Sequence, residues 1–329
     1  MDTIAFCGNI IADQVKTIPV WPDKGMLAPI TSLRRQVGGS VCNTGIDLKT
    51  LDPSVRVVAV GAVGDDENGR FVLRTLAERG IDCSFAKTLP GVPTSFTDVM
   101  TVEPTGERTF FNMHGADSTL MPDDVDVEKL RCDIMHFGYI LLLDGMDAPD
   151  DEFGTKAARL LAKVQEAGIK TSIDIVSEQS DRFERIVRPA LRYCDYCIVN
   201  EIEGSLATGV AKEDLRGICE GLLEAGVHEK AVVHCPEAGV SLDRSGEFVR
   251  VGSLRLPDGW IKGTVGAGDA FCAGVLYSIM KGFDAEKSLR LGSCAAAMNL
   301  TSTDSIGGAK SFADTFMLDK MFARRDAAT

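Results

Sequence analysis

From about residue 130 onward, short apolar runs alternate with longer amphipathic segments, and this alternation limits the possible folds more than any other feature. The short runs have the length of buried strands and are Ile134–Phe137, Thr171–Ile175, Cys197–Val199 and Ala231–His234. The segments between them have helical spacing and are Glu152–Ala167, Asp181–Arg192 and Lys212–Ala225. Strands that alternate with helices in this way pair in parallel, and the helices cover both faces of the sheet. The pattern predicts an α/β fold with a central, mostly parallel sheet.

The first third of the chain adds short strands that do not follow this alternation. We expect them at Asp13–Val20, Leu27–Val37, Thr94–Val102 and Arg108–Met113, separated by turns at 22–25 and 104–107. Between the two pairs we expect a helix at Ser40–Leu51, a buried strand at Val55–Val60 and a helix at Asn68–Arg79. The chain shows no linker or internal repeat. We therefore expect one domain over residues 1–329, with a small β appendage formed by excursions at about 13–37 and 94–113.

The carboxyl-terminal part is expected to be helical. Apolar residues follow Gly268 at the spacing of one helix face, namely Phe271, Val275, Leu276 and Ile279. A second helix is expected from about Ala285 to Leu300.

Charge and apolar content exclude several classes of protein. The 329 residues are 45% hydrophobic, which is enough to bury a large core. The net charge of −13 disfavours binding to nucleic acid or to anionic membranes. The longest stretch without Asp, Glu, Lys or Arg is the thirteen residues Leu291–Thr303, shorter than the ~18 of a membrane-spanning helix. Because the amino terminus also has no basic leader region, we expect a cytoplasmic protein with neither a nucleic-acid nor a membrane partner.

The sharpest chemical signal is the segment GTVGAGDAF at residues 263–271. Small residues let backbone amides approach an anion, and the start of the following helix favours negative charge. Asp269, in the first helical turn, could take a proton from an attacking hydroxyl while the turn holds the developing phosphoryl charge. The alternative is that Asp269 only caps the helix and the glycines form a tight turn. The segment alone does not decide between these interpretations.

A second glycine cluster, QVGGSVCNTG at residues 36–45, also lies where a strand gives way to a helix. On its own it is either a plain turn or a hinge that permits close approach. With both clusters together, the chain resembles the ribokinase-like (PfkB) carbohydrate kinase family, which combines a Gly-Gly turn and an Asn-bearing helix with a carboxyl-terminal D-T-x-G-A-G-D. The resemblance extends from the strand at Thr3–Gly8 to the helix that ends near Leu300.

This resemblance implies both a fold and an activity. The fold is ribokinase-like, with helices on both faces of the sheet and a small β-sheet lid. The activity is ATP-dependent, Mg²⁺-assisted phosphorylation of a hydroxyl group on a sugar or sugar-like small molecule. A nucleoside kinase of the same family is the alternative.

The resemblance also implies roles on the acceptor side. Asp269 is implied as the catalytic base, and the anion hole corresponds to Gly266, Ala267 and Gly268. Asp13 is implied to bind sugar hydroxyls, although without the resemblance it has the features of a surface turn residue. The substrate-side turn and its amide correspond to Gly38, Gly39 and Asn43.

On the nucleotide side, Asn200 and Glu203 match the family's N-x-x-E. They are implied to lie near the phosphates of ATP, with Glu203 holding Mg²⁺ through water. Without the resemblance they form an ordinary helix cap with its third-position acid. Gly239, Thr264 and Asn299 are the further residues expected to bind the nucleotide.

Some residues depart from the family pattern. Gly263 stands where relatives carry the first aspartate of D-T-x-G-A-G-D, so we do not expect activation by K⁺. The strand at 172–178 keeps Asp174 but lacks the proline, asparagine and arginine that usually follow. His234 and Pro236 replace a threonine and a glycine of the nucleotide-side motif, so the contacts to adenine stay unassigned.

The acceptor and the oligomeric state remain open. His114 either binds a hydroxyl or is an ordinary packed or surface residue, and Arg34 and Arg35 either bind an acidic group or are solvated. Trp21 is either a contact in a homodimer formed through the lid or a simple packing residue. An NAD-dependent oxidoreductase is not expected, because the first strand is not followed by G-x-G-x-x-G. A catalytically silent sugar-binding protein is hard to reconcile with an intact 266–269 segment.

Overall fold

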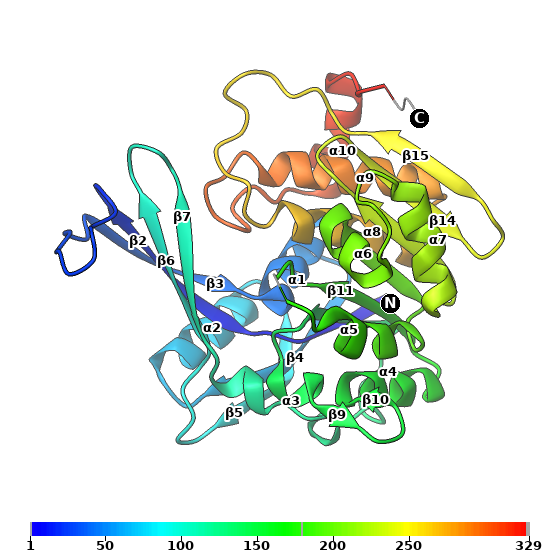
Figure 1. The fold of residues 1–329 in the computed structure, drawn as a ribbon, viewed down its shortest axis with the longest axis horizontal. Coiled ribbons are helices and arrows are strands. Elements are labelled where there is room, and N and C mark those ends of the chain that lie inside the picture. Colours follow the sequence, from blue (N-terminus) through cyan, green and yellow to red (C-terminus); the bar gives the residue numbers. More distant parts are fainter. Residues whose placement is uncertain (1, 179, 327–329) are drawn as a thin grey trace.

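A computed structural model describes residues 2–178 and 180–326, and within them nine strands form the main sheet (Figure 1). The strands are, in spatial order, β15 Phe248–Gly252, β14 Ala238–Asp243, β13 Lys230–His234, β12 Tyr196–Asn200, β11 Lys170–Ile175, β8 Ile134–Ile140, β1 Thr3–Cys7, β4 Arg56–Gly64 and β5 Asp82–Leu89. In this spatial order, all neighbouring strands from β13 through to β5 pair in parallel. Strands β14 and β15 add an antiparallel edge. The predicted mostly parallel sheet is confirmed.

Helices cover both faces of this sheet. One apolar core lies between the sheet and α1, α2, α8 and α9, and a second lies between the sheet and α4, α5 and α7. These helices are α1 Ser40–Leu51, α2 Glu67–Glu78, α4 Lys156–Glu166, α5 Phe183–Leu191, α7 Leu215–Ala225, α8 Ala267–Met280 and α9 Ala285–Asn299. The other described elements are α3 Asp144–Asp147, α6 Glu201–Thr208, α10 Phe312–Met321, 3-10 turns at Ala116–Thr119 and Pro122–Asp124, and the hairpin of β9 Pro149–Asp150 with β10 Gly154–Thr155. Within the described part of the chain, no helix combines the length and apolar character needed to cross a membrane.

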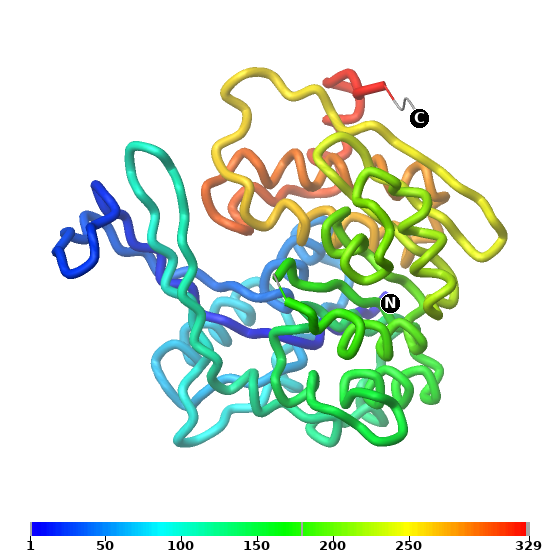
Figure 2. The backbone as a smooth tube through the Cα atoms, in the orientation of Figure 1, coloured from blue at the N-terminus to red at the C-terminus, as the bar shows by residue number. Residues whose placement is uncertain are grey.

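A second, four-stranded sheet extends from one side of the body (Figures 1 and 2). Its order is β3-β2-β6-β7, with bounds β3 Ser32–Gly38, β2 Ile11–Ile18, β6 Phe96–Val102 and β7 Arg108–Met113. Figure 2 shows that its two hairpin turns point away from the main sheet. The register pairs Asp13 with Gln36 and Thr97, and Thr97 with Asn112, so these side chains form one row across the sheet.

Several predicted elements are shorter in the structure than the sequence suggested, most clearly one helix and one strand. The helix expected from Glu152 begins at Lys156, because residues 149–155 form the β9–β10 hairpin and the Thr155 hydroxyl caps the helix by accepting from the Ala158 amide. The strand expected from Leu27 begins only at Ser32. Strands β5, β14 and β15 and helix α10 were not predicted.

The parallel strands place their carboxyl ends at one edge of the main sheet. Tyr139 lies on β8, Asp174 on β11, Asn200 on β12 and His234 on β13, all near their carboxyl ends. These four side chains line one cavity together with Asp269, which comes from the first turn of α8. The topology therefore gathers the chemistry at this edge.

Candidate active site

The glycine-rich turn before α8 requires glycine at its last position. Gly266 has φ 81°, in the left-handed region that favours glycine. A Cβ atom on Gly266 would also lie 2.3 Å from the backbone oxygen of Ser305, so the loop after α9 packs directly against the turn. Backbone at Gly266 and Gly268 lines the cavity at the amino end of α8. This arrangement suits the binding of an anion at the helix start.

Asp269 is almost completely buried and is held by three side chains. The hydroxyl of Tyr139 lies 2.9 Å from both carboxylate oxygens of Asp269. The amide nitrogen of Asn43 donates to Oδ2 at 3.1 Å, and the hydroxyl of Thr44 makes a longer contact of 3.4 Å with Oδ1. Only 7% of the Asp269 surface is exposed.

The environment of Asp269 makes its carboxylate more basic than usual. Burial, and then the nearby Asp174 carboxylate, raise the pKa of Asp269 to about 7. The hydrogen bonds from Tyr139, Asn43 and Thr44 lower it but do not cancel this effect. A carboxylate with this pKa is suited to accept a proton near neutral pH.

A cavity of about 510 Å³, here called the carboxylate cavity, opens in front of Asp269. Its polar lining consists of Asp13, Asn43, Thr97, Asn112, Tyr139, Asp174, Ser177, Asn200, Glu203, His234 and Asp269. Burial raises the pKa of Asp13 to about 6, while a hydrogen bond with Thr97 lowers it. Four acidic side chains therefore face one space: Asp13 from the small sheet, Asp174 from the end of β11, Glu203 from the start of α6 and Asp269 from the start of α8.

The Gly38-Gly39 pair joins β3 to α1, and the predicted residues Gly39 and Asn43 both line this cavity. Gly39 has φ 85°, and a Cβ atom there would lie 2.4 Å from the backbone oxygen of Asn9. Gly38 packs against the side chain of Asp13. Because α1 begins at Ser40, Asn43 lies in its first turn, within reach of Asp269.

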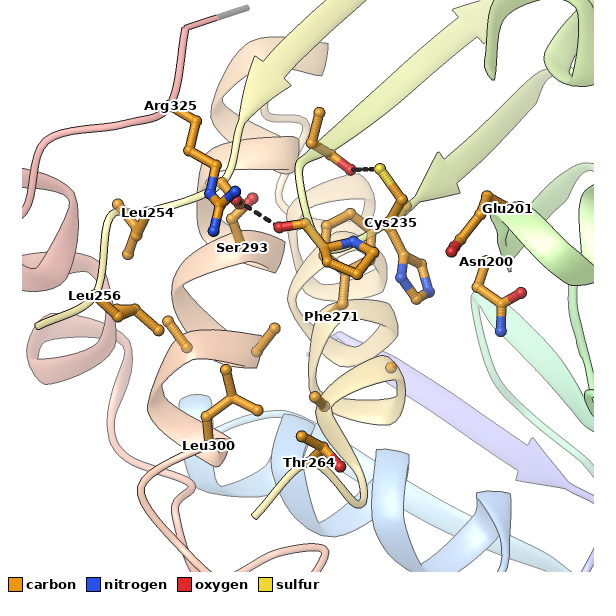
Figure 3. A pocket seen from close by; sticks show the side chains of 18 of the residues that line it. Asn200, Glu201, Cys235, Leu254, Leu256, Thr264, Phe271, Ser293, Leu300 and Arg325 are labelled. Atoms are coloured by element: carbon orange, nitrogen blue, oxygen red, sulfur yellow. Dashed lines mark hydrogen bonds between the residues drawn. The ribbon is translucent and has the colours of Figure 1, made fainter. Parts of the chain in front are cut away.

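A second cavity of about 490 Å³, here called the apolar cavity, lies on the other side of the α8 amino end (Figure 3). Figure 3 shows Leu254, Leu256, Phe271 and Leu300 around it, with Arg325 at one side. The two cavities share the lining residues Asn200, His234 and Gly268. They therefore meet at the start of α8, next to Asp269.

Asn200 and Glu203 form a complete capping box at the start of α6. The Asn200 side-chain oxygen accepts from the Ile202 and Glu203 amides, and the Glu203 carboxylate accepts from the Asn200 amide. The Ser177 hydroxyl donates to the other oxygen of Glu203 at 2.7 Å. Burial raises the pKa of Glu203 to about 8. Both residues therefore serve the helix cap and also line the carboxylate cavity.

Thr264, which is expected to bind the nucleotide, lines the apolar cavity, whereas Gly239 and Asn299 line neither cavity. Gly239 lies on β14, where a Cβ atom would touch the Phe271 ring at 3.1 Å, so it faces the helices beneath. The Asn299 amide donates to the backbone oxygen of Ser305 at 2.6 Å and holds the loop that packs on the glycine-rich turn. Both residues therefore contact neighbouring parts of the protein, and their binding to the nucleotide stays a prediction.

Four other side chains considered as candidates from the sequence lie outside both cavities, namely His114, Arg35, Trp21 and Arg34. His114 contacts Asp144 at 2.9 Å and Arg35 pairs with Glu67 at 3.0 Å. Trp21 stacks on Phe111 at the exposed surface of the small sheet. Arg34 is exposed, opposite Val15 in the register.

The sequence analysis missed several residues that the structure brings to the site. Tyr139 and Thr44 were given no role, and both contact Asp269. Asn112 and Phe110 lie on the expected lid strand and line the carboxylate cavity from β7. The one sequence signal for Tyr139 was its position at the end of a buried strand. Thr44 directly follows Asn43 within the QVGGSVCNTG cluster, but the pattern gave it no role of its own.

Comparisons with known proteins agree with this geometry. Residues 1–311 match the profile of the pfkB family carbohydrate kinases. The 5-dehydro-2-deoxygluconokinase of Shouchella clausii is 24% identical over 285 residues, which cover 81% of each chain.

Two solved structures show the same fold. The Arabidopsis thaliana ribokinase complexed with ribose and ATP has a TM-score of 0.80 at 20% identity and covers 96% of this chain and 98% of its own. An Escherichia coli protein described as a ribokinase II, in complex with ATP and Mg²⁺, has a TM-score of 0.78 at 18% identity and covers 98% of this chain and all of its own. Because the family match covers nearly the whole length, this chain belongs to the pfkB family of carbohydrate kinases.

Proposed function

We propose that this kinase transfers the γ-phosphoryl group of ATP to a hydroxyl of a sugar or sugar-like acceptor, with Asp269 as the base. The acceptor oxygen forms a bond to the γ-phosphorus, and the bond from that phosphorus to the β,γ-bridging oxygen breaks, releasing ADP. The acceptor's hydroxyl proton goes to the Asp269 carboxylate. The observation that carries this proposal is the position of Asp269 beside the junction of the two cavities.

The apolar cavity fits the base of ATP. Leu254, Leu256 and Phe271 offer flat apolar surface, and the cavity continues to the amino end of α8. Phosphates would then lie against the amides of Gly266, Ala267 and Gly268, which we propose as the anion hole. Thr264 lines the same cavity and is proposed to contact the nucleotide.

The residues present also fit a water-coordinated Mg²⁺. Mg²⁺ keeps several waters and would neutralise charge on the phosphates when bound. Both oxygens of Glu203 already accept hydrogen bonds, from Ser177 and from the Asn200 backbone, so contact through water disturbs the cap least. We propose that Asn200 and Glu203 orient this water shell.

The carboxylate cavity supports an uncharged, hydroxyl-rich acceptor. Among its described lining residues there is no lysine or arginine, whereas Asp13 can accept from acceptor hydroxyls. Arg34 lies on the same face of the small sheet, two register pairs away from the pair of Asp13 with Gln36. Acidic sugars therefore belong in the acceptor panel as the contrasting class.

A nucleoside is the second candidate acceptor. Phe110 lines the carboxylate cavity yet is 56% exposed, so its ring is free to stack on a base that enters from the small sheet. We propose that this sheet acts as a lid over the acceptor.

The outer face of the lid supports a homodimer contact. Trp21, Leu33 and Phe111 are exposed there, and Trp21 and Phe111 are stacked. Sedimentation of the wild-type protein and of Leu33→Lys would test it, since a dimer through this face should dissociate in the variant.

The decisive experiment measures ADP release from ATP and Mg²⁺ with a panel of ketoses, aldoses, polyols, sugar acids and nucleosides. We expect an uncharged sugar-like compound to stimulate ADP release the most. Preference for a nucleoside would favour the second candidate. ADP release that no hydroxyl compound stimulates would contradict the proposal.

A further inference from the structure

Tyr139 lies in a strained part of the backbone at the carboxyl end of β8. Its φ is 58°, and that of Leu141 is 90°; over residues 2–178 and 180–326 these are the only positive φ values outside glycine. A bulky residue in this region is uncommon and persists only where neighbouring contacts hold it. Strain of this kind is typical of functional sites, and the contacts that hold Tyr139 in this conformation therefore bear on its role.

A buried polar chain anchors the Tyr139 peptide. Its amide donates to Oδ1 of Asp174 at 2.5 Å. The other oxygen of Asp174 lies 3.2 Å from Nε2 of His136, whose Nδ1 lies 3.0 Å from the Ser172 hydroxyl. His136 and Ser172 are fully buried. The chain therefore fixes the position from which the tyrosine side chain extends.

The hydroxyl of Tyr139 lies directly in front of the Asp269 carboxylate. Its oxygen is 2.9 Å from both carboxylate oxygens, so one O–H faces the pair, while Asn43 and Thr44 each approach a single oxygen. An acceptor hydroxyl that gives its proton to Asp269 must come within about 2.6–3.2 Å of the same carboxylate. Tyr139 also lines the carboxylate cavity, where that acceptor would lie.

We propose that Tyr139 is a positioning residue whose hydroxyl occupies the acceptor's place on Asp269 in the free enzyme and yields that place when the acceptor binds. The inference rests on the proposed role of Asp269 as base. It has two consequences. Without acceptor, the tyrosine keeps water from the base and so limits hydrolysis of ATP. As a donor, it also keeps the carboxylate ionised.

The other groups that face Asp269 do not supply this donor. None of the described acids nearby favours the ionised base: the charge of Asp174 raises the pKa of Asp269, and the charge of Asp269 in turn helps to raise the pKa values of Glu203 and Asp47. Burial lowers the pKa of His234 to about 4, so this residue is neutral at working pH. Burial raises the pKa of the Cys272 thiol, so it carries no charge either.

The test is Tyr139→Phe, which keeps the ring and removes the hydroxyl. We expect the acid limb of the pH profile of kcat/KM for the acceptor to move up by about one pH unit, the effect of losing one hydrogen bond to a charged group. We also expect the ratio of acceptor-independent ATP hydrolysis to phosphoryl transfer to rise several-fold. An unchanged acid limb or an unchanged ratio would overturn the proposal.

If the Tyr139→Phe variant folds poorly, a second variant still tests the proposal. 3-Fluorotyrosine at position 139 retains the shape and donates more strongly, so the acid limb should move down instead of up. Tyr277→Phe is the matched control: Tyr277 lies on α8, and its hydroxyl makes a 3.4 Å contact with Asp52. We expect it to leave both readouts unchanged.

A parallel assay separates failure of this inference from failure of the proposed function. If Asp269→Asn retains more than half of the transfer activity, the base assignment itself is wrong. If Asp269→Asn is inactive and Tyr139→Phe matches the wild-type protein in both readouts, only the role of Tyr139 is wrong.

Discussion

The carboxylate of Asp13 occupies the space that a side chain on Gly38 would need. An ideal Cβ atom on Gly38 would lie 2.3 Å from Oδ2 of Asp13 and 2.7 Å from its Cγ. The two residues lie on the same face of β2 and β3, two register pairs apart. The glycine is therefore required for the aspartate to point into the carboxylate cavity, and this links the Gly-Gly turn to acceptor binding.

Gly38→Ala should raise the KM for the acceptor, because the added methyl group displaces the carboxylate that we expect to accept from acceptor hydroxyls. The KM for ATP should change little, since the apolar cavity is lined by other residues. Steady-state kinetics with each substrate varied in turn measures both values. Gly45→Ala is the control, because a Cβ atom there meets Phe6 at an ordinary 3.5 Å. Equal changes in the two variants would argue against a specific role for Gly38.

Asp269→Asn should lower kcat by roughly 10²–10⁴-fold, the usual effect of losing a general base. The amide keeps the shape and size of the side chain, so binding of ATP should stay close to that of the wild-type protein. Single-turnover kinetics and titration with an ATP analogue separate the two effects. Loss of nucleotide binding in place of loss of turnover would mean that Asp269 acts as a structural cap.

The pH dependence of kcat/KM should show an acid limb near pH 7. Burial and the Asp174 carboxylate raise the pKa of Asp269 to about 7, so the base loses its charge as the pH falls through this value. Activity should fall about tenfold per pH unit below the limb. A limb near pH 4 would mean that the carboxylate is better solvated than its buried position indicates.

The sequence identified those parts of the site that are contiguous in the chain. Helix α1 could be predicted to the residue, as Ser40–Leu51, because its glycine start and apolar spacing are local signals. The glycine-rich turn and Asp269 were likewise recognisable within a few residues of each other. The contact of Tyr139 with Asp269, by comparison, spans 130 positions, and no local pattern records which strand end will face the helix.

The same limit applies to the nucleotide-side residues. Gly239 was assigned to the nucleotide from its position in a motif, and in the structure it packs against Phe271. Asn299 was expected there without a motif, and its side chain binds the backbone of Ser305. A motif gives the order of residues along the chain. Which face of the strand or helix meets the ligand depends on packing against elements far away in sequence.

Asp47→Asn should stabilise the protein, and more so at higher pH. Asp47 lies on α1 one turn after Asn43, is 3% exposed, and neither of its carboxylate oxygens has a hydrogen-bond partner. Burial, and then the charge of Asp269, raise the pKa of Asp47 well above its usual value. Above the unfolded pKa of about 4, ionisation favours the unfolded chain, so this acid costs stability as the pH rises. Thermal unfolding at pH 8 should show a rise in Tm of about 2 °C or more.

Asp52→Asn provides the control of opposite sign for that measurement. Hydrogen bonds to Ser54 and contact with Lys281 lower the pKa of Asp52 despite its partial burial. This group therefore contributes stability above the unfolded pKa and loses it as the pH falls through the folded one. The variant should have a slightly lower Tm at pH 8. A rise in Tm for both variants would indicate a general effect of reduced negative charge.

Position 263 carries a glycine and therefore offers no carboxylate beside the glycine-rich turn. A Cβ atom there would lie 2.7 Å from the backbone oxygen of Ser302, so the facing loop occupies the space where a longer side chain would begin. The next acid on that loop, Asp304, already accepts from the Ile306 and Gly307 amides, which leaves less of its charge for a cation. Backbone carbonyls alone would have to hold K⁺ against its hydration. We expect activity without K⁺ to stay within a few-fold of that at high K⁺, measured at constant ionic strength. A saturating rise of tenfold or more that tetramethylammonium does not reproduce would show that other residues of this loop bind the cation.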